Sequence, residues 1–326
     1  MDPFKKEFKR YKQRQPPPDL SEVIDFTQPV GEPFKKWVTT TETHISDVAR
    51  TSDFGLLPSN EWRVYGIRDH PGFIFILNPF LPGAQWQWIE KCIKDYPCKP
   101  NLCNLDAHME RTCTNTIWDE SRSFESCMKK SLLYKLRWVT LGYHYNWDDK
   151  TYNKKRHTPF PPDLGQLMEF IATTLQFPSF KPEAGIINYY HLDSTLSGHT
   201  DHSEFDLTAP LFSLSFGQTA IFLLGGKTRE QVPLAMYLRS GDIMIMARNS
   251  RLAYHAVPRI LSSPTHAGAQ SLPLCLMKDK DKPSENCSEK DDVILEHYLT
   301  SSRINFNVRQ VLAPGKEFPD EGLEEE

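Results

Sequence analysis

Hydrophobic residues in the second half of the chain come in short runs, and Gly, Ser or Pro turns separate one run from the next. The runs are rich in β-branched and aromatic residues, which favour the extended conformation. Short strands at this spacing are typical of a β-sandwich or barrel. The expected strands are Gly185–Tyr190, Pro210–Phe216, Ala220–Leu224, Ala235–Leu238, Asp242–Met246, Tyr254–Ile260 and Arg303–Leu312.

The first half mixes helices with irregular segments. Apolar residues recur at helical spacing from Pro82 to Tyr96 and from Asp163 to Phe177, so a helix is expected in each range. Residues 21–60 are polar and are expected to be irregular. Further expected elements are a buried strand at Phe73–Leu77, a short helix near Trp118 within a 97–130 loop, a strand and exposed loop over Leu132–Trp147, and a short helix over 292–300.

The N-terminal segment, Met1–Arg14, has its aromatic residues at helical spacing among Lys and Arg side chains, and the prolines at 16–18 end the pattern. A docked amphipathic helix is the simplest interpretation. A mitochondrial address or a nucleic-acid contact is the alternative, and Asp2 and Glu7 weaken the address.

Composition limits the class of protein. Of the 326 residues, 39% are hydrophobic and 12% aromatic, which is too apolar for a disordered chain. The longest apolar runs fall far below the roughly 18 residues that span a bilayer, so no membrane segment is expected. The 7 cysteines form no Cys-x-x-Cys pair, and reduced thiols are expected rather than disulfides or a zinc site.

Charge is nearly balanced overall, at −4, but not locally. The segment 129–156 carries eight Lys or Arg side chains against Asp148 and Asp149, and aromatic residues are interleaved with them. Basic side chains follow phosphates and aromatic rings stack on bases, so the pattern favours nucleic-acid binding. A core strand with a solvated rim has the same composition.

Candidate metal ligands lie in the strand-rich half. His199 and Asp201 are two residues apart, so in an extended segment both side chains point the same way, and His255 follows on a later strand. Two His and one carboxylate leave half of an octahedron open, as non-haem Fe(II) oxygenases require. A His-x-Asp triplet alone also occurs in surface loops.

A pair of arginines supports the oxygenase interpretation. Arg303 and Arg309 are six residues apart on the last expected strand, so they share a face. Two arginines on a largely apolar strand need an anionic partner, and a bidentate guanidinium suits a carboxylate. Surface salt bridges are the alternative.

These residues occur within longer motifs that resemble the AlkB family of iron- and 2-oxoglutarate-dependent dioxygenases. The motifs are Asn188-Tyr189-Tyr190, His199-Thr200-Asp201, Ser240-Gly241-Asp242, His255-Ala256-Val257-Pro258-Arg259 and Arg303-Ile304-Asn305-Phe306-Asn307-Val308-Arg309, and the resemblance covers about 60–313. Two positions depart from the family pattern. Asn307 stands where Thr is common, and His202 stands where a basic Arg is common.

The resemblance implies an α+β, mainly β protein with a double-stranded β-helix, or jelly-roll, core, supporting helices and a nucleotide-recognition lid. It implies Fe(II) bound by His199, Asp201 and His255, and O2 as cosubstrate. The residues implied to hold 2-oxoglutarate are Asn188, Tyr190, Arg303, Asn305 and Arg309. The implied organisation is a basic helix and extension over 1–60, a dioxygenase domain over 61–313 and an acidic tail over 314–326. Within the domain, the lid would cover about 97–156 and a flexible insertion about 261–291.

The resemblance further implies oxidative demethylation or oxidation of methylated bases. The implied substrates are tRNA carrying N1-methyladenosine or 5-methylcytidine and single-stranded or unpaired DNA, with an abasic-site lyase side activity. It also implies mitochondrial and nuclear localisation. No obligate protein partner is evident from the sequence. The candidate substrate contacts are Trp118, Tyr143, His144, Tyr145, Asn146 and His202, whereas Phe73, Trp86 and Trp88 are expected in the core.

Two other functions are also compatible with this sequence. A protein or small-molecule hydroxylase would keep the iron and 2-oxoglutarate residues but would not need the basic and aromatic segment. A nucleic-acid-binding scaffold with a relic site would not need an intact triad.

Overall fold

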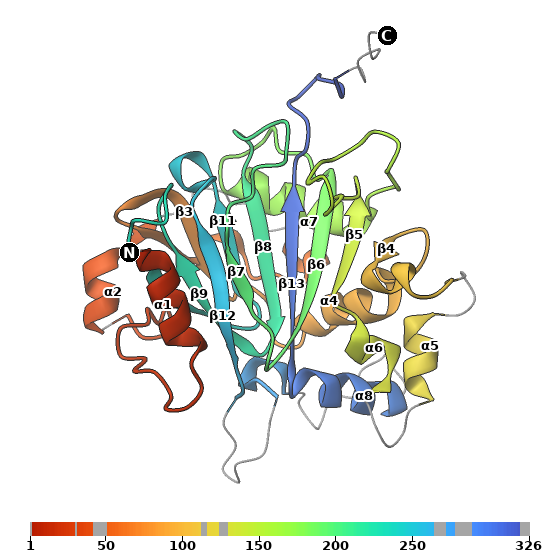
Figure 1. The fold of residues 1–326 in the computed structure, drawn as a ribbon, viewed down its shortest axis with the longest axis horizontal. Coiled ribbons are helices and arrows are strands. Elements are labelled where there is room, and N and C mark those ends of the chain that lie inside the picture. Colours follow the sequence, from red (N-terminus) through yellow and green to blue (C-terminus); the bar gives the residue numbers. More distant parts are fainter. Residues whose placement is uncertain are drawn as a thin grey trace.

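The computed structural model describes residues 2–29, 31–41, 51–111, 116–123, 130–263, 272–277 and 289–319. Two antiparallel sheets form its centre (Figure 1). The nine-stranded sheet has the order β1-β2-β3-β11-β8-β13-β6-β5-β4, and the four-stranded sheet has the order β10-β9-β12-β7. Strands that neighbour each other in space come from distant parts of the chain, as in a jelly roll. The predicted fold class is confirmed.

The strands of the large sheet are β1 (Val38–Thr41), β2 (Arg63–Ile67), β3 (His70–Leu77), β4 (Leu102–Cys103), β5 (Trp138–Gly142), β6 (Ala184–His191), β8 (Leu211–Gly217), β11 (Ile243–Met246) and β13 (Ser302–Arg309). Those of the small sheet are β7 (Leu196–His199), β9 (Thr219–Leu224), β10 (Leu234–Leu238) and β12 (His255–Leu261). The helices are α1 (Pro3–Lys12), α2 (Glu32–Trp37), α4 (Gln85–Glu90), α5 (Ile117–Arg122), α6 (Leu132–Lys135), α7 (Pro162–Thr174) and α8 (Glu289–Leu299).

The two faces of the large sheet pack against different partners. One face contacts the small sheet through an apolar layer that includes Phe75, Met244, Phe222 and Val257. The other face packs on α4, α7 and α8 through a larger apolar layer that contains Trp86 and Trp88. Alternate residues along each central strand therefore enter different layers. The expected burial of Trp86, Trp88 and Phe73 is confirmed.

The N-terminal helix α1 docks on β7 and β12 of the small sheet. Asp2 caps it by accepting a hydrogen bond from the Lys5 N–H, and Phe4 and Tyr11 are buried beneath it. The Phe4 ring lies so close to Gly198 that a Cβ there would stand 2.5 Å from it. The interpretation as a docked amphipathic helix is confirmed, and Gly198 is small because the ring of Phe4 occupies that space.

Several predicted elements differ from the observed ones. The helix expected from Pro82 to Tyr96 is α4 followed by one π-helical turn, Lys91–Asp95. The Leu132–Trp147 segment begins as helix α6, because Ser131 caps it by accepting from the Tyr134 N–H. Residues 21–60, expected to be irregular, contain α2 and β1. β1 pairs with β2, and its four β-branched residues, Val38–Thr41, were a local strand signal within a segment that is otherwise polar.

Parts of four predicted segments lie outside the described residues, namely 1, 30 and 42–50 of the N-terminal helix and extension, 112–115 and 124–129 of the lid, 264–271 and 278–288 of the insertion, and 320–326 of the acidic tail. The domain boundaries stay predictions. Among the described residues, no helix is both long and apolar enough to cross a membrane.

Candidate active site

Two strands of the small sheet bring the candidate metal ligands together. β7 ends at His199, β12 begins at His255, and these two residues are paired in the ladder. Asp201 follows two residues after β7. One ligand atom from each of the three residues lies within 4.8 Å of the others. The Nε2 atom of His255 is 3.5 Å from Asp201 Oδ2, and that of His199 is 3.8 Å from Asp201 Oδ1.

Backbone carbonyls orient both imidazole rings. His199 Nδ1 is 2.9 Å from the Ser197 carbonyl, and His255 Nδ1 is 3.1 Å from the Ala253 carbonyl. Because a carbonyl only accepts, each Nδ1 carries the proton and each Nε2 keeps a free lone pair. Both rings are thereby held in the tautomer that binds a metal through Nε2.

The surrounding charges keep the carboxylate of the site ionised. Burial alone would raise the pKa of Asp201, but Arg309, His255 and His199 lower it well below the usual range. Burial, with a contribution from His199, lowers the pKa of His255 to about 4. A neutral imidazole and an ionised carboxylate are the forms that coordinate a divalent cation.

A second set of polar residues lies on the large sheet, on the face toward the small sheet. Arg303 pairs with Tyr190 and Asn305 pairs with Asn188 across β13 and β6. The intervening residues Ile304, Phe306 and Val308 point into the opposite, helix-packed layer. The predicted common face of Arg303 and Arg309 is confirmed, because both line one cavity of about 280 Å³ with the three candidate metal ligands.

Arg303 brings a buried positive charge to this cavity. It is 1% exposed, and its Nη atoms donate to the Gln218 and Leu238 carbonyls and to Ser215 Oγ. Its Nε makes no hydrogen bond, and it forms no ion pair with a carboxylate of the described residues. Burial lowers the pKa of Arg303 to about 10, which leaves it charged at neutral pH. A buried cation without a counter-ion is costly, so a bound anion would stabilise it.

Tyr190 and Asn305 complete the polar surface. Burial raises the pKa of Tyr190 to about 12, so its hydroxyl is a neutral hydrogen-bond donor. The Asn305 amide donates to Ser213 Oγ and the Leu214 carbonyl, which fixes its orientation. Asn188 also lines the cavity. This set of donors fits a small dicarboxylate such as 2-oxoglutarate, and the imidazole and carboxylate ligands fit Fe(II).

The candidate substrate residues do not all reach the cavity. Tyr145 and His202 line it. Tyr143 packs instead against His157 and Phe318, and Asn146 forms a bridge with Thr151.

Two of the candidates are buried. Trp118, on α5, belongs to the apolar layer behind the large sheet, with the Lys94 ammonium 5.0 Å from its ring. His144 lies between Thr140 and Thr158, and burial lowers its pKa to about 4. These positions do not support a base contact for Trp118 or His144. Trp118 is 6% exposed and His144 is 2% exposed.

Other residues of the cavity were not singled out from the sequence. Trp147, at the mouth, is 42% exposed and leans on Trp138, with 4.1 Å between ring centroids. Its position within the basic and aromatic segment 129–156 was the sequence feature that could have indicated a substrate contact. Glu204, also in the lining, lies three residues after the metal-motif residue Asp201. Its burial depends on Arg251 and Tyr152, which approach from other segments.

A facial set of two histidines and a carboxylate, beside a buried arginine that lacks an anion, defines a mononuclear iron oxygenase that uses an oxo-acid cosubstrate. Residues 72–309 match the family model of the 2OG-Fe(II) oxygenase superfamily. The chain belongs to the AlkB family of these oxygenases, and it is a dioxygenase that uses Fe(II) and 2-oxoglutarate.

The chain is similar in sequence to three characterised proteins over most of its length. The chain is 47% identical to the human protein "Nucleic acid dioxygenase ALKBH1", over 100% of this chain and 88% of that one. It is 32% identical to "DNA N(6)-methyladenine demethylase ALKBH1A" of Arabidopsis thaliana, over 93% and 90% of the two chains. It is 31% identical to "tRNA demethylase abh1" of Schizosaccharomyces pombe, over 94% and 95%.

Proposed function

We propose that this dioxygenase oxidises methyl groups on the bases of nucleic acid, chiefly of tRNA that carries N1-methyladenosine or 5-methylcytidine, and also of unpaired DNA. The names of the human, plant and yeast relatives, which refer to nucleic acid, DNA and tRNA respectively, support this substrate class.

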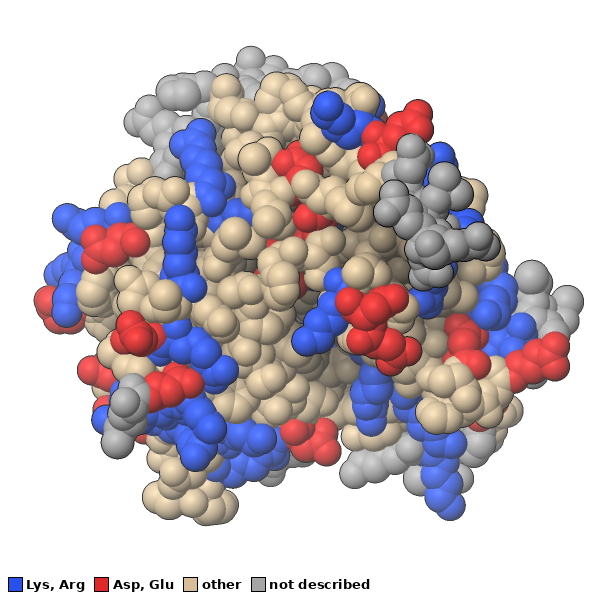
Figure 2. All heavy atoms as spheres, turned by 45° about the horizontal axis from the view of Figure 1, so that its top comes forward, with Lys and Arg blue, Asp and Glu red and all other residues tan. Residues whose placement is uncertain are grey.

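The observation that carries the proposal is the composition of the cavity mouth. Tyr145, Trp147 and Lys150, from one loop, line the same cavity as His199 and Asp201. Two aromatic rings and an ammonium at the entrance suit a base that has left its stack, with its phosphate outside. In Figure 2, many Lys and Arg side chains, with Asp and Glu side chains among them, lie around a mainly uncharged central area. That arrangement gives a strand of nucleic acid phosphate contacts around the entrance.

The chain's residues would have separate tasks in the reaction. His199, Asp201 and His255 would hold the metal, and Arg303 with Tyr190 would hold the distal carboxylate of 2-oxoglutarate. Leu196, Phe222 and Val257 make the rest of the lining apolar and exclude water. When bound, iron and 2-oxoglutarate supply the oxidation, with succinate and carbon dioxide as products. A hydroxylated N-methyl group then leaves as formaldehyde, whereas a methyl group on a ring carbon stays as hydroxymethyl.

The test is aerobic incubation with Fe(II), 2-oxoglutarate and a panel of oligonucleotides, read by mass spectrometry of the bases. The panel contains N1-methyladenosine, 5-methylcytidine and N6-methyladenine in single-stranded, hairpin and duplex contexts, and Asp201→Ala is the blank. Loss or oxidation of the methyl group in unpaired contexts is expected. Succinate formation with no change in any base would favour a protein or small-molecule hydroxylase. Absence of succinate formation with iron supplied would favour a relic site.

A lyase side activity at abasic sites has one specific observation in its favour. It requires an amine that attacks the sugar aldehyde, loses water to form an imine and promotes elimination of the 3′ phosphate. Within the described chain, Lys150 is the lysine that lines the cavity. Borohydride should trap a covalent adduct with abasic DNA in the unmodified protein and not in Lys150→Arg. Equal trapping in both would exclude Lys150.

Mitochondrial and nuclear localisation stays a prediction. Fractionation of cells that express the protein with a C-terminal tag would test it.

A further inference from the structure

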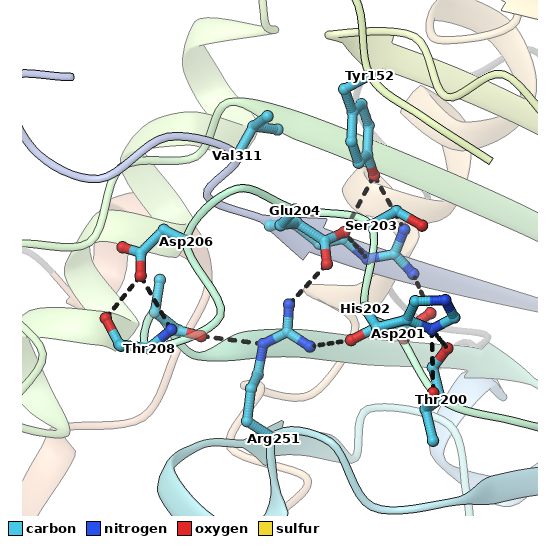
Figure 3. A network of polar contacts seen from close by, with 12 residues as sticks. Tyr152, Thr200, Asp201, His202, Ser203, Glu204, Asp206, Thr208, Arg251 and Val311 are labelled. Carbon is cyan, nitrogen blue, oxygen red and sulfur yellow. Dashed lines mark hydrogen bonds and ion pairs between the residues drawn. The ribbon is translucent and has the colours of Figure 1, made fainter. Parts of the chain in front are cut away.

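A buried polar network joins the metal ligand Asp201 to a loop at the mouth of the cavity (Figure 3). Arg309 lies at its centre, and each of its nitrogens has a different neighbour. Nη2 is 3.0 Å from Asp201 Oδ1, Nε is 3.4 Å from Glu204 Oε1, and Nη1 donates to the Tyr152 hydroxyl at 3.1 Å. Three groups from two segments of the chain, Tyr152 and the 201–204 segment, therefore surround the guanidinium.

Glu204 and Arg251 extend the network to the backbone. The Tyr152 hydroxyl donates to Glu204 Oε1 at 3.2 Å, and Arg251 Nη2 donates to Glu204 Oε2 at 2.8 Å. Arg251 Nη1 also donates to the Asp201 carbonyl at 2.6 Å. Arg309 therefore contacts the side chain of Asp201, and Arg251 contacts its backbone carbonyl. Glu204 contacts both arginines.

The charges in this network balance only when it is complete. The carboxylates of Glu204 and Asp201 face the guanidinium groups of Arg251 and Arg309, and all of these side chains are largely removed from solvent. Burial lowers the pKa of Arg309, but Asp201, Tyr152 and Glu204 raise it well above the usual value. When one oxygen of Asp201 ligates a metal, Arg309 remains the partner that orients the carboxylate.

Tyr152 connects this network to the loop. Over 145–157 it is the single buried residue, 3% exposed, whereas Trp147, Lys150 and Lys154 on either side are exposed. Its ring packs against Ala184, Val311 and Leu312. The loop is therefore anchored at one side chain, and the hydroxyl of that side chain contacts Arg309 and Glu204.

We propose that Tyr152 and Glu204 are positioning residues that orient Arg309 and Asp201 for metal binding, and that they couple the loop 145–157 to occupancy of the metal site. Metal binding fixes Asp201 and Arg309, which strengthens the hold on the Tyr152 hydroxyl and orders the loop. That this loop receives the nucleic acid rests on the proposed function. The positioning of Asp201 does not.

The test uses the chain of 326 residues without nucleic acid, so its result is independent of the proposed substrate. Tyr152→Phe removes the hydroxyl and keeps the ring. Its matched control is Tyr96→Phe, because Tyr96 is 4% exposed and its hydroxyl donates to a carboxylate, Asp163, at the same 3.2 Å but outside the cavity. Glu204→Gln keeps the shape and removes the charge.

Two quantities are measured for each variant. The first is the affinity for Mn(II) in the presence of 2-oxoglutarate, by calorimetry. Loss of a direct partner of a metal ligand typically weakens metal binding by about 10–100-fold. Tyr152 acts on Asp201 through Arg309, so Tyr152→Phe is expected at the lower end, about 10-fold, and Glu204→Gln is expected to bind more weakly still. The second is amide hydrogen exchange over 145–157 with and without Mn(II). Metal should slow exchange in the unmodified protein and in Tyr96→Phe, and should have little effect in Tyr152→Phe.

Each contrary result overturns a defined part of the proposal. Unchanged Mn(II) affinity in Tyr152→Phe would reduce its hydroxyl to a packing role. Weakened affinity with an unchanged metal effect on loop exchange would overturn the coupling and leave the positioning role. A failure of every nucleic-acid substrate, with both readouts as expected, would refute the proposed function alone.

Discussion

Replacement of Arg303 by Ala tests the cosubstrate site most directly. The guanidinium is buried, its Nη atoms are fixed by two carbonyls and a hydroxyl, and it has no carboxylate partner in the described chain. A charge-assisted bond to the distal carboxylate of 2-oxoglutarate in such a site is worth about 2–5 kcal/mol. Since 1.4 kcal/mol is tenfold, the KM for 2-oxoglutarate should rise by about 30-fold or more.

The assay separates this effect from a loss of structure. Succinate formation is measured against 2-oxoglutarate and, in parallel, against the oligonucleotide substrate. Only the first KM should change strongly. A second comparison uses 2-oxopentanoate, which has a methyl group in place of the distal carboxylate. The unmodified enzyme should prefer 2-oxoglutarate by roughly the same factor that Arg303→Ala loses, and the variant should barely distinguish the two acids.

Equal increases in both KM values would refute the reasoning, because Arg303 would then act as a general structural residue. Retained preference for 2-oxoglutarate in the variant would also refute it, because another group would hold the distal carboxylate. Thermal unfolding with Mn(II) present checks that the variant is folded, since the carbonyls of Gln218 and Leu238 lose a donor.

Four further outcomes are expected. Asp201→Ala should abolish methyl oxidation and Mn(II) binding while the circular dichroism spectrum is kept; turnover in a folded variant would refute the triad. Alanine at Lys154, Lys155 and Arg156 should make the salt slope of RNA binding less steep by about 2, with succinate formation in the absence of RNA unchanged. The Lys154 ammonium lies on the surface, 4.0 Å from Glu317. Tyr145→Ala and Trp147→Ala should each weaken RNA binding by about 1–3 kcal/mol if a base stacks there, and unchanged affinity would show that neither ring does. Burial raises the pKa of Asp242 to about 7, so the folded state holds a proton that the unfolded chain releases near pH 4. The free energy of unfolding should therefore fall between about pH 4 and pH 7 and stay constant at higher pH. Urea titrations of Asp242→Asn should lack this pH dependence.

The sequence predicted the chemistry of the centre better than its surroundings. His199, Asp201 and Arg303 lie within strands or directly after them, so a two-residue period was enough to put them on common faces. The burial of Trp118 was not predictable in this way. Its side chain is covered by residues that are distant in the sequence, and a local composition rich in Ser, Asn and Cys carries no trace of that contact.

The short strand β7 illustrates the same limit. Leu196-Ser197-Gly198-His199 has neither alternation nor β-branched residues, and pairing with β12 makes it a strand. Tyr152 and Glu204 belong to segments that the sequence did mark, but their joint burial depends on Arg251 and Arg309. Motifs therefore identified the ligands, whereas the groups that hold the ligands required the folded chain.

Polar and apolar side chains alternate strictly along β13, so a change in the length of this strand would disturb both of its faces. Arg303, Asn305 and Arg309 occupy the cavity face, and Ile304, Phe306 and Val308 fill the opposite layer. The deletion of one residue between 303 and 309 would exchange the two sets, which would drive a guanidinium into the apolar layer and an aliphatic side chain into the cosubstrate site. A replacement that keeps the apolar or polar character of a position would keep this alternation, whereas a change of length would break it. The alternation therefore constrains the spacing between the two arginines.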